Sequence, residues 1–194
     1  MNLADFEDAL KRAIGLDAAS IGSSAVERAV RVRMTALGLR DTGDFAARVR
    51  SSEEELQELI EAIVVPETWF MRDREAFTAL ARLVYEEWVR THPEGVLRVL
   101  SVPCSTGEEP YSIAMTLLDA GLPPARFRVD AIDVSRHALA KAARGVYGKN
   151  SFRGGELAFR DRHFTAAGAH WALRESVRQQ VTFARGNLLD ADLM

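Results

Sequence analysis

The chain contains little of the residue types that mark several classes of protein. It has one cysteine, Cys104, and four scattered histidines among 194 residues. A single thiol cannot form an internal disulfide and has no second cysteine with which to bind a metal, so we predict no disulfide and no metal site. We interpret Cys104 as a buried filler rather than a nucleophile, because no basic residue nearby in the sequence would stabilise its thiolate.

Long apolar runs are also lacking. No stretch approaches the roughly 20 apolar residues that cross a bilayer. The N-terminus has neither the basic start nor the apolar core of a signal peptide. The net charge of −3 gives no general reason to expect nucleic acid as a partner. We therefore expect a cytoplasmic globular protein that does not insert into membranes.

The spacing of the apolar residues divides the chain into two parts, and the first part has a helical pattern. Through residue 65, apolar residues recur at helical spacing, and Gly15 and Gly38 stand where helices should end. Two serine–glutamate pairs, Ser24 with Glu27 and Ser52 with Glu55, have the spacing of helix caps. We predict an all-helical domain over residues 1–65, followed by a linker and a long helix over residues 66–95.

From residue 96 the chain alternates between apolar strands and helices. The pattern predicts strands at 96–102, 127–132 and 180–184, with helices at 110–119 and 135–144. This order is typical of a parallel, doubly wound sheet, so we predict an α/β domain over residues 96–194. Residues 145–180 are too many for a plain connection and should carry small elements of their own.

The turn between the first predicted strand and its helix is the most informative segment. A strand, a polar turn and a helix favour a nucleotide-type ligand at the helix N-terminus. This turn has one glycine, Gly107, and two glutamates, Glu108 and Glu109, which would repel a pyrophosphate. A ligand with positive charge is therefore favoured, and S-adenosylmethionine fits because its sulfonium and ammonium groups are cationic.

Asp133 follows at the end of the second predicted strand. A carboxylate there can accept hydrogen bonds from both hydroxyls of a ribose. The alternative is that Asp133 caps the next helix, but Ser135 is the better-placed cap.

The run from Cys104 to Ser112 closely resembles the signature of the CheR family of chemotaxis-receptor methyltransferases. Three further segments, at 67–73, 131–135 and 187–190, follow in the order of that family. The pairing of residues 65–68 with this core most resembles the branch that serves Wsp-type signalling systems. The resemblance implies a helical N-terminal domain followed by a class I, Rossmann-like methyltransferase sheet, with a small β-subdomain within 145–180. Because the chain ends after three predicted strands, we expect this sheet to be partial, incomplete at its C-terminus.

The resemblance also implies the site. Arg72 is the predicted catalytic residue, since a guanidinium can align the carboxylate that accepts the methyl group. Alternatives are that Arg72 pairs with Asp73 or Glu75 at the surface, and that Glu108 only complements the helix dipole. Pro66 stands where family members commonly have asparagine, so the cofactor hydrogen bond implied at that position is not expected from this side chain. The residues implied to bind the cofactor are Thr68, Arg72, Glu108, Asp133, Asn187 and Leu188, the last two on the adenine side.

The implied reaction transfers a methyl group to glutamate side chains of a methyl-accepting, chemoreceptor-like protein and leaves S-adenosylhomocysteine. The family meets its receptors through a basic helix, which places Arg28, Arg31 and Arg33 as candidate receptor contacts. Alternatively, these arginines form an ordinary solvated helix face, and Arg31 and Arg33 do not share one face. Two other functions stay open: a non-catalytic module that binds S-adenosylmethionine or a receptor, and methylation of a small molecule or another protein. The sequence does not indicate an oligomeric state.

Overall fold

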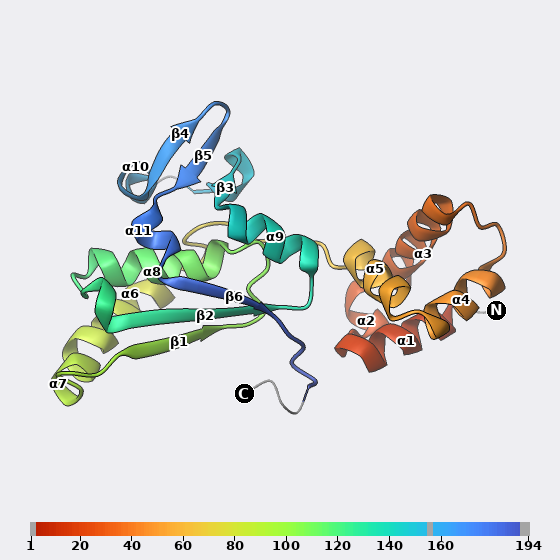
Figure 1. Cartoon of the computed structure of the whole chain (residues 1–194), viewed down its shortest axis with the longest axis horizontal. Helices are drawn as coiled ribbons and strands as arrows, with labels where there is room; N and C mark the ends of the chain where they lie inside the picture. The colour runs from red at the N-terminus through yellow and green to blue at the C-terminus, as the bar shows by residue number, and fades with distance from the viewer. Residues whose placement is uncertain (1–2, 155–156, 191–194) are drawn as a thin grey trace. The chain divides into compact units, whose positions relative to one another are not determined.

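The structure is a computed structural model, and it describes residues 3–154 and 157–190. The contacts divide the chain into two compact units, and Figure 1 shows the elements of each. We call residues 1–65 together with 186–194 the helical unit, and residues 66–185 the α/β unit. None of the helices in the described part of the chain is both long enough and apolar enough to cross a membrane.

The helical unit is built around one apolar core. Phe6 and Phe45 stack at its centre with their ring centroids 5.4 Å apart. Gly15 and Gly38 end helices in the left-handed conformation, as predicted, and Ser52 accepts a hydrogen bond from the Glu55 amide as the predicted cap. The helices are α1 Ala4–Ile14, α2 Ala18–Ile21, α3 Ser23–Leu37, α4 Thr42–Ser51 and α5 Glu53–Ile63.

The cap predicted at Ser24 is wrong. Helix α3 begins at Ser23, one residue earlier, and Gly22 stands at the capping position without a side-chain hydrogen bond. Gly22 has a φ of 81°, a backbone conformation open to glycine, so the chain can enter the helix without the extended residue that a serine cap requires.

The main sheet of the α/β unit confirms the predicted fold class. Its three strands are parallel in the order β1-β2-β6, with Leu97 opposite Phe127 and Val129 opposite Val181. Each strand and helix predicted in this region is present, and each predicted end lies within two residues of the observed one. The elements are β1 Leu97–Ser101, α8 Glu108–Asp119, β2 Phe127–Asp133, α9 Arg136–Arg144 and β6 Val181–Arg185, with a short helical turn at Pro124–Arg126. In Figure 1 the strands lie side by side, and α8 runs along one face of the sheet.

The long helix predicted after the linker is interrupted. It consists of α6 Arg74–Leu83, a five-residue π-helical turn at Val84–Trp88, and α7 Val89–Thr91. At its end the His92 ring stacks on Trp88, and Arg126 donates hydrogen bonds to the carbonyls of His92 and Gly95. These contacts end the helix and fix where the chain enters β1.

A second, smaller sheet occupies part of residues 145–180. Its strands are antiparallel in the order β3-β5-β4. An aromatic cluster packs beneath it, in which Phe70 from the linker contacts the rings of Tyr147, Phe152 and Phe164. The elements are β3 Val146–Tyr147, a 3-10 turn at Lys149–Ser151, α10 Ala158–His163, β4 Phe164–Ala167, β5 His170–Leu173 and α11 Glu175–Arg178.

Candidate functional site

Asp133 connects the two turns that follow β1 and β2. The residue is 4% exposed, and its two carboxylate oxygens accept hydrogen bonds from the backbone amides of Ser105 (2.7 Å) and Ser135 (2.9 Å). Ser135 itself caps α9 by accepting from the Ala138 amide, so Asp133 is not the cap of that helix. Each carboxylate oxygen keeps a second lone pair for another donor.

Glu108 lies buried at the first turn of α8. The residue is 1% exposed, and its carboxylate oxygens accept hydrogen bonds from the hydroxyls of Thr106 (2.6 Å) and Ser151 (2.8 Å). Within the described residues, no lysine or arginine pairs with it. The neighbouring Glu109 is exposed and accepts a hydrogen bond from Ser101. A buried carboxylate with only hydroxyl partners is costly unless a cation joins it, which favours a cationic ligand over a mere dipole role.

Gly107 and Tyr147 fix the conformation of the turn before Glu108. Gly107 has a φ of 93°, and a β-carbon there would lie 2.8 Å from the Ala142 β-carbon and 2.9 Å from the Tyr147 hydroxyl. Tyr147 donates a hydrogen bond to the Thr106 carbonyl, and burial raises its pKa well above the ordinary value. Glycine is therefore required here by both space and backbone conformation.

Cys104 is buried in the same turn, as predicted for a filler. Burial, and next the charge of Asp133, raise the pKa of its thiol to about 12. At neutral pH the thiol is protonated and therefore a poor nucleophile.

The linker that carries Thr68 and Arg72 is held against this turn. The Phe70 amide donates to the Ser151 carbonyl, and the Met71 amide donates to the Ser112 hydroxyl, which in turn donates to the Glu108 carbonyl. Met71 has a φ of 55°, an unusual conformation for a residue other than glycine. Backbone strain of this kind persists where surrounding contacts enforce it, and it is common at functional sites.

Arg72 is exposed, and an aromatic ring orients it. Its Nη1 donates to the Glu67 carbonyl (3.0 Å), and its guanidinium lies 4.6 Å from the centroid of the Trp69 ring. The surface pairing with Asp73 or Glu75 that we considered as an alternative is not among the described contacts. A second guanidinium, that of Arg153, lies 5.1 Å from the same ring. Two cationic groups therefore gather at Trp69.

The structure brings four of the six predicted cofactor residues into the α/β unit and the other two into the helical unit. Thr68 is half-buried in the linker beside Arg72. Asn187 donates a hydrogen bond to the Ala13 carbonyl at the end of α1, and Leu188 is 64% exposed. The role of Asn187 and Leu188 beside an adenine stays a prediction.

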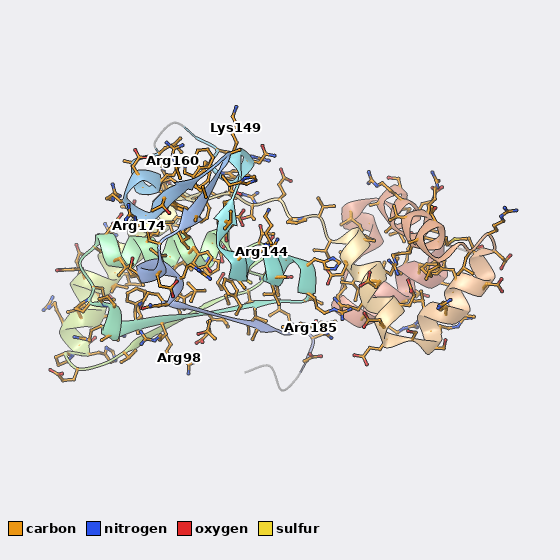
Figure 2. All side chains as sticks on the ribbon, turned by 45° about the horizontal axis from the view of Figure 1, so that its top comes forward. Arg98, Arg144, Lys149, Arg160, Arg174 and Arg185 are labelled. Atoms are coloured by element: carbon orange, nitrogen blue, oxygen red, sulfur yellow. The ribbon has the colours of Figure 1, made fainter. Side chains whose placement is uncertain are left out.

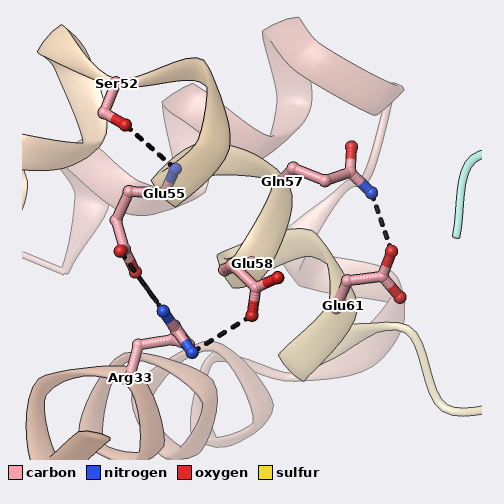
Figure 3. A network of polar contacts seen from close by, with 6 residues as sticks. All are labelled: Arg33, Ser52, Glu55, Gln57, Glu58 and Glu61. Carbon is pink, nitrogen blue, oxygen red and sulfur yellow. Dashed lines mark hydrogen bonds and ion pairs between the residues drawn. The ribbon is translucent and has the colours of Figure 1, made fainter. Parts of the chain in front are cut away.

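The three predicted receptor-contact arginines of α3 differ in their surroundings. Arg28 is exposed, and Arg31 pairs with Glu27 on the exposed surface. Arg33 is only 18% exposed and donates two hydrogen bonds to the buried Glu55, with Glu58 as a second partner (Figure 3). Arg33 therefore joins α3 to α5, whereas Arg28 and Arg31 are the two that a partner could reach.

Several residues that hold the site were not identified from the sequence. Ser151 supplies a hydrogen bond to Glu108, and Arg153 supplies the second cation at Trp69. Both lie in residues 145–180, far from the other segments along the chain. Their only sequence signal was a region rich in Gly, Arg and aromatic residues that is too long for a plain connection.

Fold and site together define a nucleoside-cofactor domain with a parallel sheet, joined to a helical domain. Residues 66–194 match the family described as "CheR methyltransferase, SAM binding domain", and residues 1–64 match "CheR methyltransferase, all-alpha domain". The chain belongs to the CheR methyltransferase family. The resemblance found in the sequence is thereby confirmed, and the predicted cofactor, S-adenosylmethionine, agrees with the matched domain.

Individual relatives support the Wsp-type branch. The chain is 56% identical over 189 residues to "Probable biofilm formation methyltransferase WspC" of Pseudomonas aeruginosa, covering 97% of this chain and 45% of the relative. It is 50% identical over 193 residues to the protein of the same name from Pseudomonas putida, covering 100% and 46%. It is 37% identical over 165 residues to "Chemotaxis protein methyltransferase" of Salmonella typhimurium, covering 81% and 55%. The chain spans about half the length of these relatives.

Proposed function

We propose that the protein transfers a methyl group from S-adenosylmethionine to glutamate side chains of a methyl-accepting signalling protein. The products are a glutamate methyl ester and S-adenosylhomocysteine. The observation that carries the proposal is a pair of buried carboxylates, Asp133 at the C-terminal end of β2 and Glu108 at the start of the helix that follows β1, beside a linker that presents Arg72. Ligands of open α/β sheets bind at this edge.

The residues present fit the proposed cofactor. Asp133 retains lone pairs for ribose hydroxyls, because its two described hydrogen bonds leave one acceptor direction on each oxygen. Glu108 offers a buried negative charge with no described cationic partner, which suits an ammonium group. When bound, S-adenosylmethionine supplies an electrophilic methyl group on a positively charged sulfur. The chain's own residues then have to hold and orient both reactants.

Arg72 is suited to orient the accepting glutamate. A glutamate is already ionised at neutral pH, so the reaction needs alignment of a carboxylate oxygen rather than removal of a proton. A guanidinium can hold a carboxylate by two parallel N–H donors. Trp69 supports the guanidinium from one face of its ring, and Arg153 at the same ring is a candidate second contact for the carboxylate.

Arg28 and Arg31 remain candidates for meeting an acidic receptor helix. Exposed cations of this kind mainly raise the rate of encounter with an oppositely charged partner. Arg33 is excluded from that role in our proposal because its guanidinium is engaged by Glu55 and Glu58.

The test is Arg72→Ala in a chain extended to the length of the Pseudomonas relatives, assayed with a radiolabelled methyl donor and the cognate methyl-accepting protein. We expect transfer to fall about a hundredfold or more, because misalignment alone can cost that much. Binding of S-adenosylhomocysteine should fall much less. Label incorporated by the unsubstituted chain should be released as methanol in alkali, as expected of a carboxyl ester.

The matched control is Arg82→Ala, which removes an exposed arginine from α6 in the same unit. Transfer by this variant should match that of the unsubstituted chain. Transfer by Arg72→Ala near the original rate would show that Arg72 is not catalytic. Binding of the cofactor product without any transfer by the unsubstituted chain would favour the non-catalytic binding module instead.

A further inference from the structure

The sequence separates its charges along the chain. Residues 136–185 contain ten lysines and arginines but three acidic residues, a net charge of +7 in a chain whose total is −3. Figure 2 marks several of these cations, including Arg144 on α9 and Lys149 in the turn that follows β3. Some of them are neutralised by neighbours, such as Arg162 by Asp119 and Arg178 by Glu175. Three cations without a described ion pair, Lys141, Arg144 and Lys149, lie together in one place, whereas Arg174 and Arg185 lie elsewhere.

That place is a cavity of about 660 Å³ between α9, the turn at 148–151 and β5. Lys141 and Arg144 line it from α9, Lys149 from the turn, and His170 from β5. No carboxylate is among the described residues that line it. The side chains of Lys141, Arg144 and Lys149 have no ion pair or hydrogen bond within the part of the chain that the structure describes. Like charges placed together without a counter-charge create a positive potential that attracts anions.

A second cavity in the same unit provides a contrast. It measures about 410 Å³ and is lined by Arg74 and Arg162 among mostly apolar residues. There, Asp119 lines the wall as well and accepts hydrogen bonds from Arg162 and His163. Its charges are partly balanced within the protein. The larger cavity therefore stands out by the chemistry of its lining and not only by its size.

The form of the larger cavity suits a small, multiply charged anion. Its two lysines and one arginine come from two elements, α9 and the turn, and His170 lines the cavity from a third, β5, so the lining is not a single helix face. Lysine, arginine and a histidine N–H are the side-chain donors that bind phosphate groups. The His170 ring lies close to Gly148, where a β-carbon would be 3.6 Å from the ring. A volume of several hundred Å³ is typical of small-molecule sites.

We propose that this cavity is a second ligand site, which binds a small phosphate-bearing compound through Lys141, Arg144 and Lys149. This inference does not rest on methyl transfer. The site is contiguous with the cofactor residues, because Ser151 lines the cavity and also donates its hydrogen bond to Glu108. The carbonyl of Ser151 holds Phe70 of the linker as well. A bound anion would therefore stabilise the turn that supports both the buried carboxylate and the linker.

The test is calorimetric titration of pyrophosphate into the chain at low ionic strength, with and without saturating S-adenosylhomocysteine. Pyrophosphate carries the phosphate chemistry without a base that could enter a nucleoside site. We expect saturable binding with one ligand per chain, and S-adenosylhomocysteine should not displace the pyrophosphate because the two sites are separate. The double variant Lys141→Gln with Arg144→Gln should weaken binding about tenfold or more, since two charge-assisted contacts are lost.

The matched control is Arg82→Gln with Arg90→Gln, which removes the same charge from exposed positions on α6 and α7. It should leave the affinity within about twofold, because exposed charges at a distance are largely screened. Circular dichroism would confirm that both variants are folded. Absence of saturable binding, equal losses in the two double variants, or displacement by S-adenosylhomocysteine would each overturn the proposal.

Two further titrations distinguish a small phosphate compound from a macromolecule. A glutamate-rich peptide and vesicles containing phosphatidylglycerol present carboxylates and lipid phosphates, respectively, on extended surfaces. The proposal expects both to bind more weakly than pyrophosphate. If either binds in a manner that depends on Lys141 and Arg144 while pyrophosphate does not, the cavity belongs to a docking surface and the proposal is wrong.

Discussion

At the residue scale, the site depends on a few residues whose conformation is fixed by their neighbours. Gly107 turns the chain into α8 at a φ that side chains disfavour, and it does so against Ala142 and Tyr147. Glu108 follows immediately and is buried. Asp133 is held by two backbone amides, so its carboxylate direction is set before any ligand arrives. These residues preorganise the site.

We predict that Gly107→Ala destabilises the α/β unit by about 2–4 kcal/mol, combining left-handed backbone strain with overpacking. The comparison is Gly154→Ala, where φ is 102° but no described atom lies within 4 Å of the new β-carbon. That variant should lose only about 1–2 kcal/mol. Urea unfolding followed by tryptophan fluorescence measures both, because Trp69, Trp88 and Trp171 all lie in this unit.

Equal losses in the two glycine variants would mean that the contacts of Gly107 with Ala142 and Tyr147 contribute nothing. The turn would then require glycine only for its backbone conformation.

At the residue scale, sequence reasoning identified groups by their chemistry but not by their partners. Asp133 was proposed because a carboxylate at a strand end is a recognisable pattern, and Glu108 because the turn before α8 resembles that of the family; both cofactor contacts stay predictions. Ser151 was not found, because its contact with Glu108 spans 43 positions and depends on how residues 145–180 fold back. Arg33 was placed with Arg28 and Arg31 because helix periodicity alone does not reveal which helix packs against which face.

At the scale of elements, α3 and α5 are joined by the contacts of Arg33. The hydrogen bond with Glu55 raises the pKa of the Arg33 guanidinium, which stays charged at every relevant pH. The side chain of Glu55 is 8% exposed, so its buried carboxylate needs the positive charge of Arg33 nearby. Nearby, Gln57 donates to Glu61 within α5 (Figure 3).

We predict that Arg33→Ala lowers the free energy of unfolding of the helical unit by about 3–5 kcal/mol, because it leaves Glu55 buried without a counter-charge. Arg31→Ala should cost less than about 1 kcal/mol, since its pair with Glu27 is exposed on both sides. Replacing Arg33 and Glu55 together by methionine should be close to neutral. Urea unfolding followed by far-UV circular dichroism gives these values.

A small effect of Arg33→Ala, comparable to that of Arg31→Ala, would contradict a structural role for the buried pair. It would return Arg33 to the group of arginines available to a partner.

The order of the elements was predictable because the spacing of apolar residues changes at residue 96, from a helical pattern to apolar strands that alternate with helices. The βαβαβ pattern fixed the parallel sheet, and glycines at positions 15 and 38 marked helix ends. The π-helical turn at Val84–Trp88 was not predictable, since it preserves the apolar spacing that an uninterrupted helix would have. The cap at Ser24 failed because Gly22 offered another way into the helix.

At the scale of the whole molecule, the family match accounts for the order of helical and α/β units, and the chain spans about half the length of its relatives. Binding of the cofactor and transfer of the methyl group are therefore best separated experimentally. Binding is the first property to measure, because Glu108 at the start of α8 and Asp133 at the end of β2 are both present in this chain.

The most direct measurement is calorimetric binding of S-adenosylhomocysteine to this chain and to a chain extended to the length of its relatives. The variants are Asp133→Ala and Glu108→Gln. The control is Asp130→Ala: Asp130 lies on β2, as Asp133 does, but its carboxylate pairs with Arg98. We predict that the extended chain binds, that Asp133→Ala and Glu108→Gln each weaken binding about tenfold or more, and that Asp130→Ala does not. No binding by the extended chain, or affinity that is unchanged in both site variants, would contradict the assignment of these two carboxylates to the cofactor.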